Sequence, residues 1–144
     1  MIEIRFMQQE DLDTVAQIEQ ETFSMPWSKA GFASSLGRED TLYLSAFSDG
    51  ELAGYCGLLQ VLDEGEITNV AVKKSFRGQK IASRLMEELL KKGSQRGITF
   101  FVLEVRKSNH AAIHLYEKTG FSKAGIRKNF YEKPIEDAVI MSKQ

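Results

Sequence analysis

The segment from Ile67 to Val105 restricts the possible folds more than any other part of this sequence. An apolar stretch comes first, a basic polar turn follows, and a helical pattern then leads into the nearly continuous apolar run from Phe100 to Val105. The helical part carries two apolar rows opposite charged residues, namely Ile81, Leu85, Leu89 and Ala82, Met86, Leu90. A strand, a helix and a second strand in this order predict a parallel, right-handed unit of an α/β fold. The last strand is expected to be covered on both faces because it is almost wholly apolar.

Further strands and helices are predicted around this unit. Apolar patterning indicates five more strands, over 2–6, 42–47, 52–61, 121–131 and 135–142. Helical spacing indicates three more helices, over about 9–25, 28–36 and 109–118. Asp49-Gly50 is a strong hairpin signal, a turn over 63–65 is expected before the strand at 67–72, and Asp11 and Asp13 are expected to favour the first helix through its dipole. The order β-α-α-β-β-β-α-β-α-β-β predicts a mixed sheet with helices on both faces.

Length and charge narrow the class of protein. The 144 residues suit a single domain, 1–144, and 19 basic against 20 acidic residues give a net charge of −1. This balance provides no overall cationic field, so neither nucleic acid nor a membrane surface is an expected partner. Cys56 is the only cysteine, and charges interrupt the first six residues where a secretory segment needs an apolar run. A cytoplasmic location is therefore expected.

The basic turn before the long predicted helix is a candidate anion site. Its cationic side chains are Lys73, Lys74, Arg77 and Lys80. Free backbone N–H groups at the start of a helix, together with the helix dipole, suit a pyrophosphate. Two familiar phosphate loops, G-x-x-x-x-G-K-[ST] and G-x-G-x-x-G, are absent. A solvated basic loop in front of an amphipathic helix remains an equally good interpretation of this stretch.

A second group of residues has the character of acid and base catalysts. Glu104 lies at the end of the most apolar predicted strand, where burial would raise the pKa of its carboxyl toward the range useful to a base. Asn109 and Tyr116 share one face of the following helix because they are seven residues apart. The alternatives are a solvent-facing Glu104, a buried core Tyr116 and an Asn109 that only caps its helix.

Together these residues resemble the GNAT superfamily of acetyl-CoA-dependent N-acetyltransferases. The stretch Arg77-Gly78-Gln79-Lys80-Ile81-Ala82 is similar to the family's R-x-x-G-x-[GA] loop, with Lys80 where the family usually has glycine. The second half is matched by Leu103-Glu104-Val105, Asn109, Ala112, Tyr116, Gly120 and Phe121. Within the superfamily the chain most resembles the bacterial ribosomal-protein-alanine N-acetyltransferases, through Phe23-Ser24-Met25-Pro26-Trp27-Ser28, Leu103 to Asn109, and Ile126 to Tyr131 followed by Glu136-Asp137-Ala138.

The resemblance implies a role for each matched residue. Backbone groups of Val70, Ala71 and Val72 would pair with the pantetheine arm of acetyl-CoA. The loop and first helical turn would hold the pyrophosphate, through Arg77, Gly78, Gln79, Lys80, Ile81, Ala82 and Ser83. Asn109 would also touch the coenzyme, Glu104 would be the general base, and Tyr116 would be the acid that protonates the leaving thiolate. Lys80 is expected to adopt helical backbone angles without strain, and no metal is required.

The implied acceptor is the α-amine of a protein or peptide N-terminus, in particular that of a ribosomal protein. A small amine, a lysine side chain and a coenzyme-binding sensor without turnover are the alternatives, and the nucleic-acid interpretation of the basic turn is weaker still. His110 and His114 have the spacing of two zinc ligands but lack a third, and a lone Cys56 suits a buried apolar position better than a nucleophile. Trp27 and Tyr131 each either line the acceptor site or pack in the core.

Overall fold

The computed structural model describes residues 1–144 and contains one seven-stranded mixed sheet in the order β1-β2-β3-β4-β5-β7-β6. Its strands are β1 (Ile2–Phe6), β2 (Thr41–Ser48), β3 (Glu51–Val61), β4 (Glu64–Val72), β5 (Phe100–Arg106), β6 (Ser122–Tyr131) and β7 (Glu136–Lys143). Its helices are α1 (Leu12–Thr22), α2 (Lys29–Leu36), α3 (Ile81–Gln95) and α4 (His110–Lys118), with short 3₁₀ turns η1 (Gln9–Asp11) and η2 (Lys74–Phe76). The predicted order of strands and helices is confirmed. None of the helices combines the length and apolar character that crossing a membrane requires.

The first four strands form an antiparallel meander, and β5 pairs with β4 in parallel. The predicted hairpin is present: Asp49 and Gly50 have φ values of 49° and 87°, as a two-residue type I′ turn requires. The prediction of the next turn at residues 63–65 was wrong, because Leu62 and Asp63 form it and β4 already begins at Glu64. Parallel pairing of Glu64 with Phe100 draws these residues into the strand.

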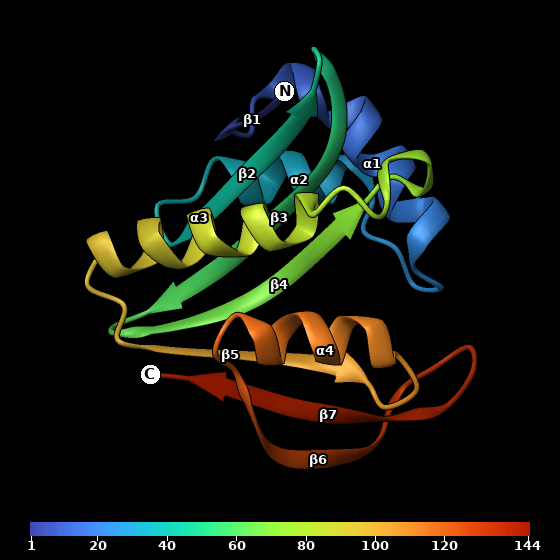
Figure 1. Ribbon diagram of the computed structural model, residues 1–144, viewed down its shortest axis with the longest axis vertical. Coiled ribbons are helices and arrows are strands. Elements are labelled where there is room, and N and C mark those ends of the chain that lie inside the picture. The colour runs from blue at the N-terminus through green and yellow to red at the C-terminus, as the bar shows by residue number, and fades with distance from the viewer.

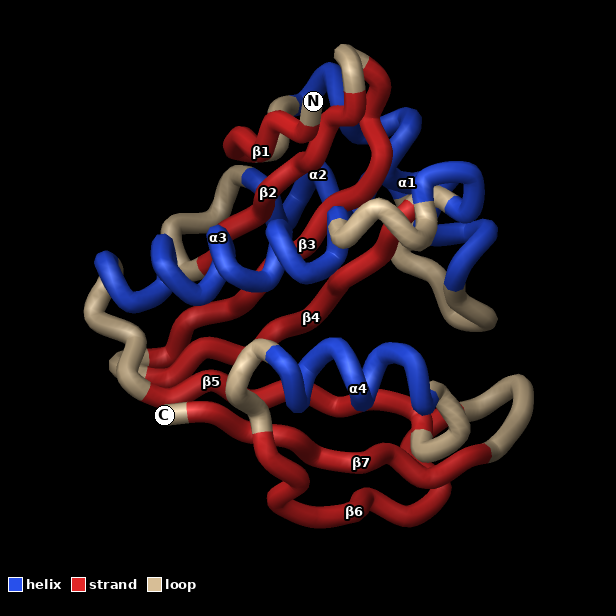
Figure 2. Tube along the Cα trace, in the orientation of Figure 1, coloured by secondary structure: helices blue, strands red, loops and turns tan.

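Helices cover both faces of the sheet, as predicted. In Figures 1 and 2, α3 and α4 lie in front of the sheet, whereas α1 and α2 lie behind it. The larger apolar core includes Leu85 and Leu89 of α3, and the smaller one includes Leu12 and Phe32. The strand β5 is not covered equally on its two faces, contrary to expectation. Its burial alternates along the strand because α1 and α2 contact β2, β3 and β4 instead.

The strand β4 contains a bulge in its pairing with β3, close to the point where its pairing with β5 ends. Gly57 of β3 pairs with Asn69 and Leu58 pairs with Ile67, so Thr68 is an extra, bulged residue. Because a one-residue insertion reverses which side chains face each side, Asn69 turns toward α1 while Ile67 stays in the core beneath α3. Pairing of β4 with β5 is confined to Glu64–Glu66, and beyond it the two strands diverge (Figure 1).

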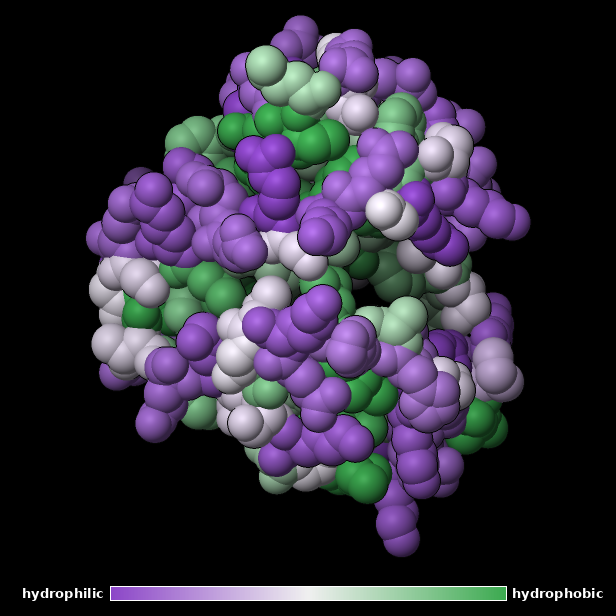
Figure 3. Space-filling model, viewed as in Figure 1, coloured by the Kyte–Doolittle hydropathy of each residue, from purple (hydrophilic) through white to green (hydrophobic).

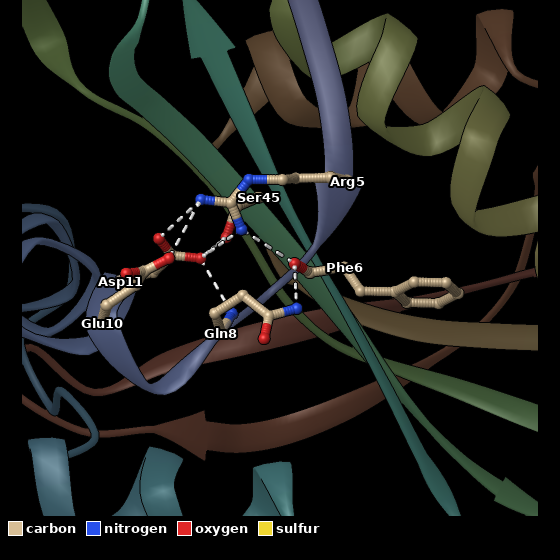
Figure 4. A network of polar contacts seen from close by, with 6 residues as sticks. All are labelled: Arg5, Phe6, Gln8, Glu10, Asp11 and Ser45. Atoms are coloured by element: carbon tan, nitrogen blue, oxygen red, sulfur yellow. Dashed lines mark hydrogen bonds and ion pairs between the residues drawn. The ribbon is translucent and has the colours of Figure 1, made fainter.

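The start of α1 is tied to the sheet by a polar network (Figure 4). Asp11 is 5% exposed and accepts two hydrogen bonds from the Arg5 guanidinium, at 3.2 and 3.1 Å. The Gln8 backbone N–H (2.8 Å) and the Ser45 hydroxyl (3.2 Å) donate to the same carboxylate. Asp11 therefore joins β1 and β2 to the helix, which is a more specific role than the dipole interaction predicted from its position. The Arg5 guanidinium also lies 4.3 Å from the Phe47 ring centroid.

Candidate active site

The divergence of β4 and β5 opens a cleft of about 1030 Å³. Figure 3 shows the surface hollowed between the half of the molecule that holds β4 and the half that holds α4, with hydrophobic residues visible inside. The cleft brings together nearly all the predicted site residues, namely Val70, Ala71, Val72, Arg77, Gly78, Lys80, Ile81, Ala82, Ser83, Glu104, Asn109 and Tyr116. Gln79 is exposed and does not line it. A smaller pocket of about 340 Å³ lies elsewhere, between Phe6 and Arg96.

Six consecutive backbone N–H groups are free at one wall of the cleft. The amides of residues 78–83 donate to no backbone carbonyl or side chain. The first backbone hydrogen bond of α3 runs from the Arg84 N–H to the Lys80 carbonyl. No side chain caps this end of α3. Unpaired amides at the start of a fifteen-residue helix form a binding site for an anion, assisted by the helix dipole. They fit a pyrophosphate.

Two residues of this loop have left-handed backbone angles. Gly78 has a φ of 85°, and Lys80, the residue that precedes α3, has a φ of 62° and a ψ of 21°. The expectation that Lys80 takes helical angles without strain was wrong, because the residue that precedes α3 is left-handed here. A non-glycine residue in this conformation costs about 1 kcal/mol. Position 80 therefore favours glycine, which is the usual residue there in the family that this sequence resembles.

The edge of β4 that faces β5 is open beyond Glu66. Its other edge is paired with β3 up to Val72, so the open edge can pair with an extended ligand. The residues fit a pantetheine arm, whose amides can extend the sheet as a strand would. The Arg77 Nε donates to the Val72 carbonyl at 3.3 Å, so this carbonyl already has a hydrogen-bond partner within the protein.

Glu104 lies on the wall of the cleft formed by β5. Its side chain is 18% exposed, and burial raises the pKa of the carboxyl above its ordinary value. Arg127, 3.4 Å from Oε2, lowers this pKa, and the charge of Glu66 raises it. Oε2 is buried and has no hydrogen-bond partner. A carboxylate with these surroundings is better suited to accept a proton near neutral pH than an exposed one.

Tyr116 and Asn109 come from α4. Tyr116 is 9% exposed, its ring packs edge-to-face against Phe121, and burial raises the pKa of its hydroxyl. It therefore remains a proton donor throughout the physiological range of pH. Asn109 Oδ1 accepts from the Ala112 N–H at 3.1 Å, so the capping interpretation is confirmed. That bond leaves the Asn109 Nδ2 free.

Two segments far apart in sequence also line the cleft. Phe23, Met25 and Trp27 line it from the loop after α1, Tyr131 lines it from the end of β6, and Pro134 lines it from the loop between β6 and β7. Trp27 also packs against Phe32, with 5.3 Å between ring centroids, and it is 36% exposed, so its role at the acceptor site stays a prediction. Burial and the nearby Glu104 charge raise the pKa of Tyr131 to about 12.

Glu19 is a buried residue of the cleft that the sequence interpretation did not assign to the site. It is 3% exposed and accepts hydrogen bonds from the Tyr55 hydroxyl (2.6 Å), Asn69 Nδ2 (3.4 Å) and the Trp27 backbone N–H (3.1 Å). It thereby connects α1 with β3, β4 and the loop after α1. The sequence does contain a signal for Glu19, because a carboxylate stands there at an otherwise apolar position of the α1 pattern.

The other polar candidates lie outside the cleft. Cys56 is fully buried, and burial raises the pKa of its thiol, which disfavours the thiolate that a nucleophile needs. His110 and His114 are exposed and do not line the cleft.

Comparison with known proteins agrees with this geometry. The profile of the acetyltransferase (GNAT) family matches residues 12–121. The ribosomal protein bS18-alanine N-acetyltransferase of Escherichia coli strain K12 is 40% identical over 134 residues, which cover 92% of this chain and 90% of that protein. A Bacillus subtilis protein provisionally given the same name is 42% identical over 139 residues, covering 96% of this chain and 92% of its own.

A solved structure supports the same grouping. The crystal structure of the ribosomal-protein-S18-alanine N-acetyltransferase from E. coli has a TM-score of 0.91 at 37% identity, and the match covers 99% of this chain and 93% of that chain. This likeness over nearly the whole chain confirms the predicted fold. Since the family profile covers most of the chain and identity is 40% or more over nearly its full length, the protein belongs to the GNAT family of acetyltransferases.

Proposed function

We propose that this protein transfers the acetyl group of acetyl-CoA to the α-amine of an N-terminal alanine in a ribosomal protein. The observation that carries the proposal is a single cleft in which free amides at residues 78–83 lie with Glu104 and Tyr116. The names of the relatives supply the acceptor, an alanine of ribosomal protein bS18. A ribosomal substrate favours a cytoplasmic location, and one catalytic domain over 1–144 is part of the proposal.

Different residues of the cleft would bind the coenzyme, align it and transfer protons during acetyl transfer. Acetyl-CoA, when bound, supplies the acetyl group as a thioester. The amides of residues 78–83 would hold its pyrophosphate, the open edge of β4 over Val70–Val72 would align the pantetheine arm, and Asn109 Nδ2 would donate to the coenzyme. Glu104 would take a proton from the acceptor ammonium, directly or through water, and the Tyr116 hydroxyl would give a proton to the leaving sulfur.

The ordinary pKa values of amines favour a chain terminus as the acceptor. An α-amine has a pKa of about 7.7 to 8.0, and a lysine side chain about 10.4. The ammonium of a chain terminus is therefore more acidic by roughly two to three pK units, and a base removes its proton more easily near neutral pH. A desolvating site can lower the pKa of a lysine, and for this reason the acceptor is decided by experiment.

A short peptide with a free N-terminal alanine and an internal lysine tests the acceptor. After incubation with acetyl-CoA, fragmentation in the mass spectrometer should locate the acetyl group on the α-amine, and blocking that amine should abolish transfer. Modification confined to lysine, or transfer only to small polyamines, would overturn the acceptor assignment and favour the alternative acceptors. Binding of acetyl-CoA without transfer to any of these amines would favour the sensor alternative.

The strain at Lys80 gives a stability prediction. Lys80→Gly should raise the free energy of unfolding by about 1 kcal/mol, because glycine adopts the left-handed conformation without cost. Acetyl-CoA affinity should be preserved if the backbone amides dominate binding. Chemical denaturation and calorimetry measure the two effects, and a loss of affinity above about tenfold, or about 1.4 kcal/mol, would instead assign binding to the ammonium.

Lys74→Gly is the matched control for this prediction. Lys74 is exposed and has a negative φ. The same substitution there should lower stability slightly, because glycine adds freedom to the unfolded chain without relieving strain. If both variants lose stability, the strain assigned to Lys80 is refuted.

A further inference from the structure

The Arg106 guanidinium joins the two loops at the acceptor end of the cleft. Nη1 donates to the Pro134 carbonyl and to Glu136 Oε1, both at 3.0 Å. Nη2 donates to the Glu132 carbonyl at 2.8 Å and to the Ser24 hydroxyl at 3.1 Å. Each of the four terminal N–H bonds of the side chain therefore has its own acceptor. A planar fork with several fixed donors makes such a set of contacts, whereas an ammonium on a flexible stem does not.

The contacts hold a strained turn in the loop between β6 and β7. Lys133 has a φ of 53°, a left-handed conformation that costs a non-glycine residue about 1 kcal/mol. Arg106 binds the carbonyls of the residues on either side of it, Glu132 and Pro134. The guanidinium also lies 4.6 Å from the ring centroid of Tyr131. Strained conformations persist where surrounding contacts determine them, and here Arg106 supplies those contacts.

Arg106 also relates these loops to the proposed base. It follows Glu104 by two residues in β5, so the two side chains leave the same face of the strand. Ser24 belongs to the loop that contributes Phe23, Met25 and Trp27 to the cleft, 108 residues before Glu132, and its hydroxyl also donates to the Glu132 carbonyl at 3.4 Å. One side chain thus sets the distance between both loops and the strand that carries Glu104.

We propose that Arg106 is a positioning residue that fixes the acceptor entrance and thereby controls acceptor binding, with little influence on coenzyme binding. This proposal rests on the proposed function, because it assumes that the acceptor enters between these two loops. The proposed coenzyme groups are different residues of the cleft, namely residues 78–83 and the edge of β4, and Arg106 makes no hydrogen bond to them. Loops that lose a shared contact must be ordered again when the acceptor binds, so a loosened entrance should appear as a higher KM for the acceptor.

Arg106→Lys tests the proposal while retaining the positive charge. The KM for the alanine peptide should rise about tenfold, because one ammonium cannot replace the four donors that order the loops, while kcat and the Kd for acetyl-CoA should change by less than about threefold. Arg38→Lys is the matched control. Arg38 makes a two-point ion pair with Asp40 on the surface, at 2.9 and 2.6 Å, and does not line the cleft, so this variant should leave KM unchanged.

Ser24→Ala provides a second test that leaves the Arg106 side chain itself unchanged. It removes the bridge between the loops and leaves the other Arg106 contacts in place. Hydrogen exchange of the free protein should become faster over residues 23–27 and 131–135 in both variants, and the KM should rise about threefold in Ser24→Ala. The exchange measurement needs no acceptor.

The outcomes separate this proposal from the proposed function. If the wild-type protein does not acetylate the peptide, the proposed function fails, and hydrogen exchange alone then tests whether Arg106 orders the two loops. If the wild type is active and the KM is unchanged in Arg106→Lys, or if kcat falls while the KM stays constant, the proposal is overturned. Unchanged exchange in both loops of both variants also overturns it.

Discussion

Glu104→Gln should lower kcat/KM for the alanine peptide by roughly 10²- to 10⁴-fold, the usual contribution of a general base. Glutamine keeps the shape of the side chain but cannot take up the ammonium proton. Acetyl-CoA affinity should be unchanged, because the proposed coenzyme groups are the amides of residues 78–83 and the edge of β4. Steady-state kinetics and calorimetry on the same preparation measure both quantities. Full activity of this variant between about pH 6 and 9, a range that brackets the ordinary α-amine pKa, would refute the role of Glu104.

The pH profile adds a test with a defined sign. Burial raises the pKa of Glu104, so the carboxyl becomes protonated, and activity falls, as pH drops through a value above the ordinary one for glutamate. Arg127→Gln removes a charge that lowers this pKa, and should move the acidic limb to higher pH. Glu66→Gln removes a charge that raises it, and should move the limb to lower pH. Both shifts should be small and should shrink in salt, because Arg127 is 60% exposed and Glu66 is exposed.

Tyr116→Phe should reduce kcat by roughly 10²- to 10⁴-fold, because it removes only the hydroxyl that would protonate the leaving thiolate. The raised pKa of this tyrosine keeps the hydroxyl protonated, so the loss should be present at every pH at which the wild type is active. The ring remains to pack against Phe121, and stability should change little.

Tyr43→Phe is the control for the loss of a buried hydroxyl. Tyr43 is 4% exposed and lies outside the cleft, at the smaller pocket. Its variant should keep the wild-type kcat. Equal activity of Tyr116→Phe and the wild type would show that the thiolate leaves without help from Tyr116.

Local patterns were sufficient to predict most of the fold. The Asp49-Gly50 turn, the Asn109 cap and the apolar rows of α3 each depend on residues close together in the sequence, and each is present in the structure. The turn before β4 was misplaced because its position depends on pairing with β5, which lies more than thirty residues further along the chain. The unequal covering of β5 likewise depends on where α1 and α2 pack.

The site was predictable where a residue type carried the chemistry. Glu104, Asn109 and Tyr116 were selected for their functional groups, and all three line the cleft. The bulge at Thr68 is a backbone feature with no distinct residue pattern, and the left-handed angles of Lys80 were missed although the family usually has glycine there. Glu19 and Arg106 act through partners far away in the sequence, and only the folded structure identifies those partners.

Amide hydrogen exchange with and without acetyl-CoA tests most directly whether the gap between β4 and β5 is the site of acetyl transfer. Binding should slow exchange most strongly at residues 78–83 and 69–72, where the free amides and the open strand edge lie, and a chelator should not alter the result. Residues around the smaller pocket, from Phe6 to Gln9, should be unaffected. Slowed exchange at the smaller pocket with none at residues 78–83, or no change anywhere at saturating acetyl-CoA, would contradict the assignment of the cleft.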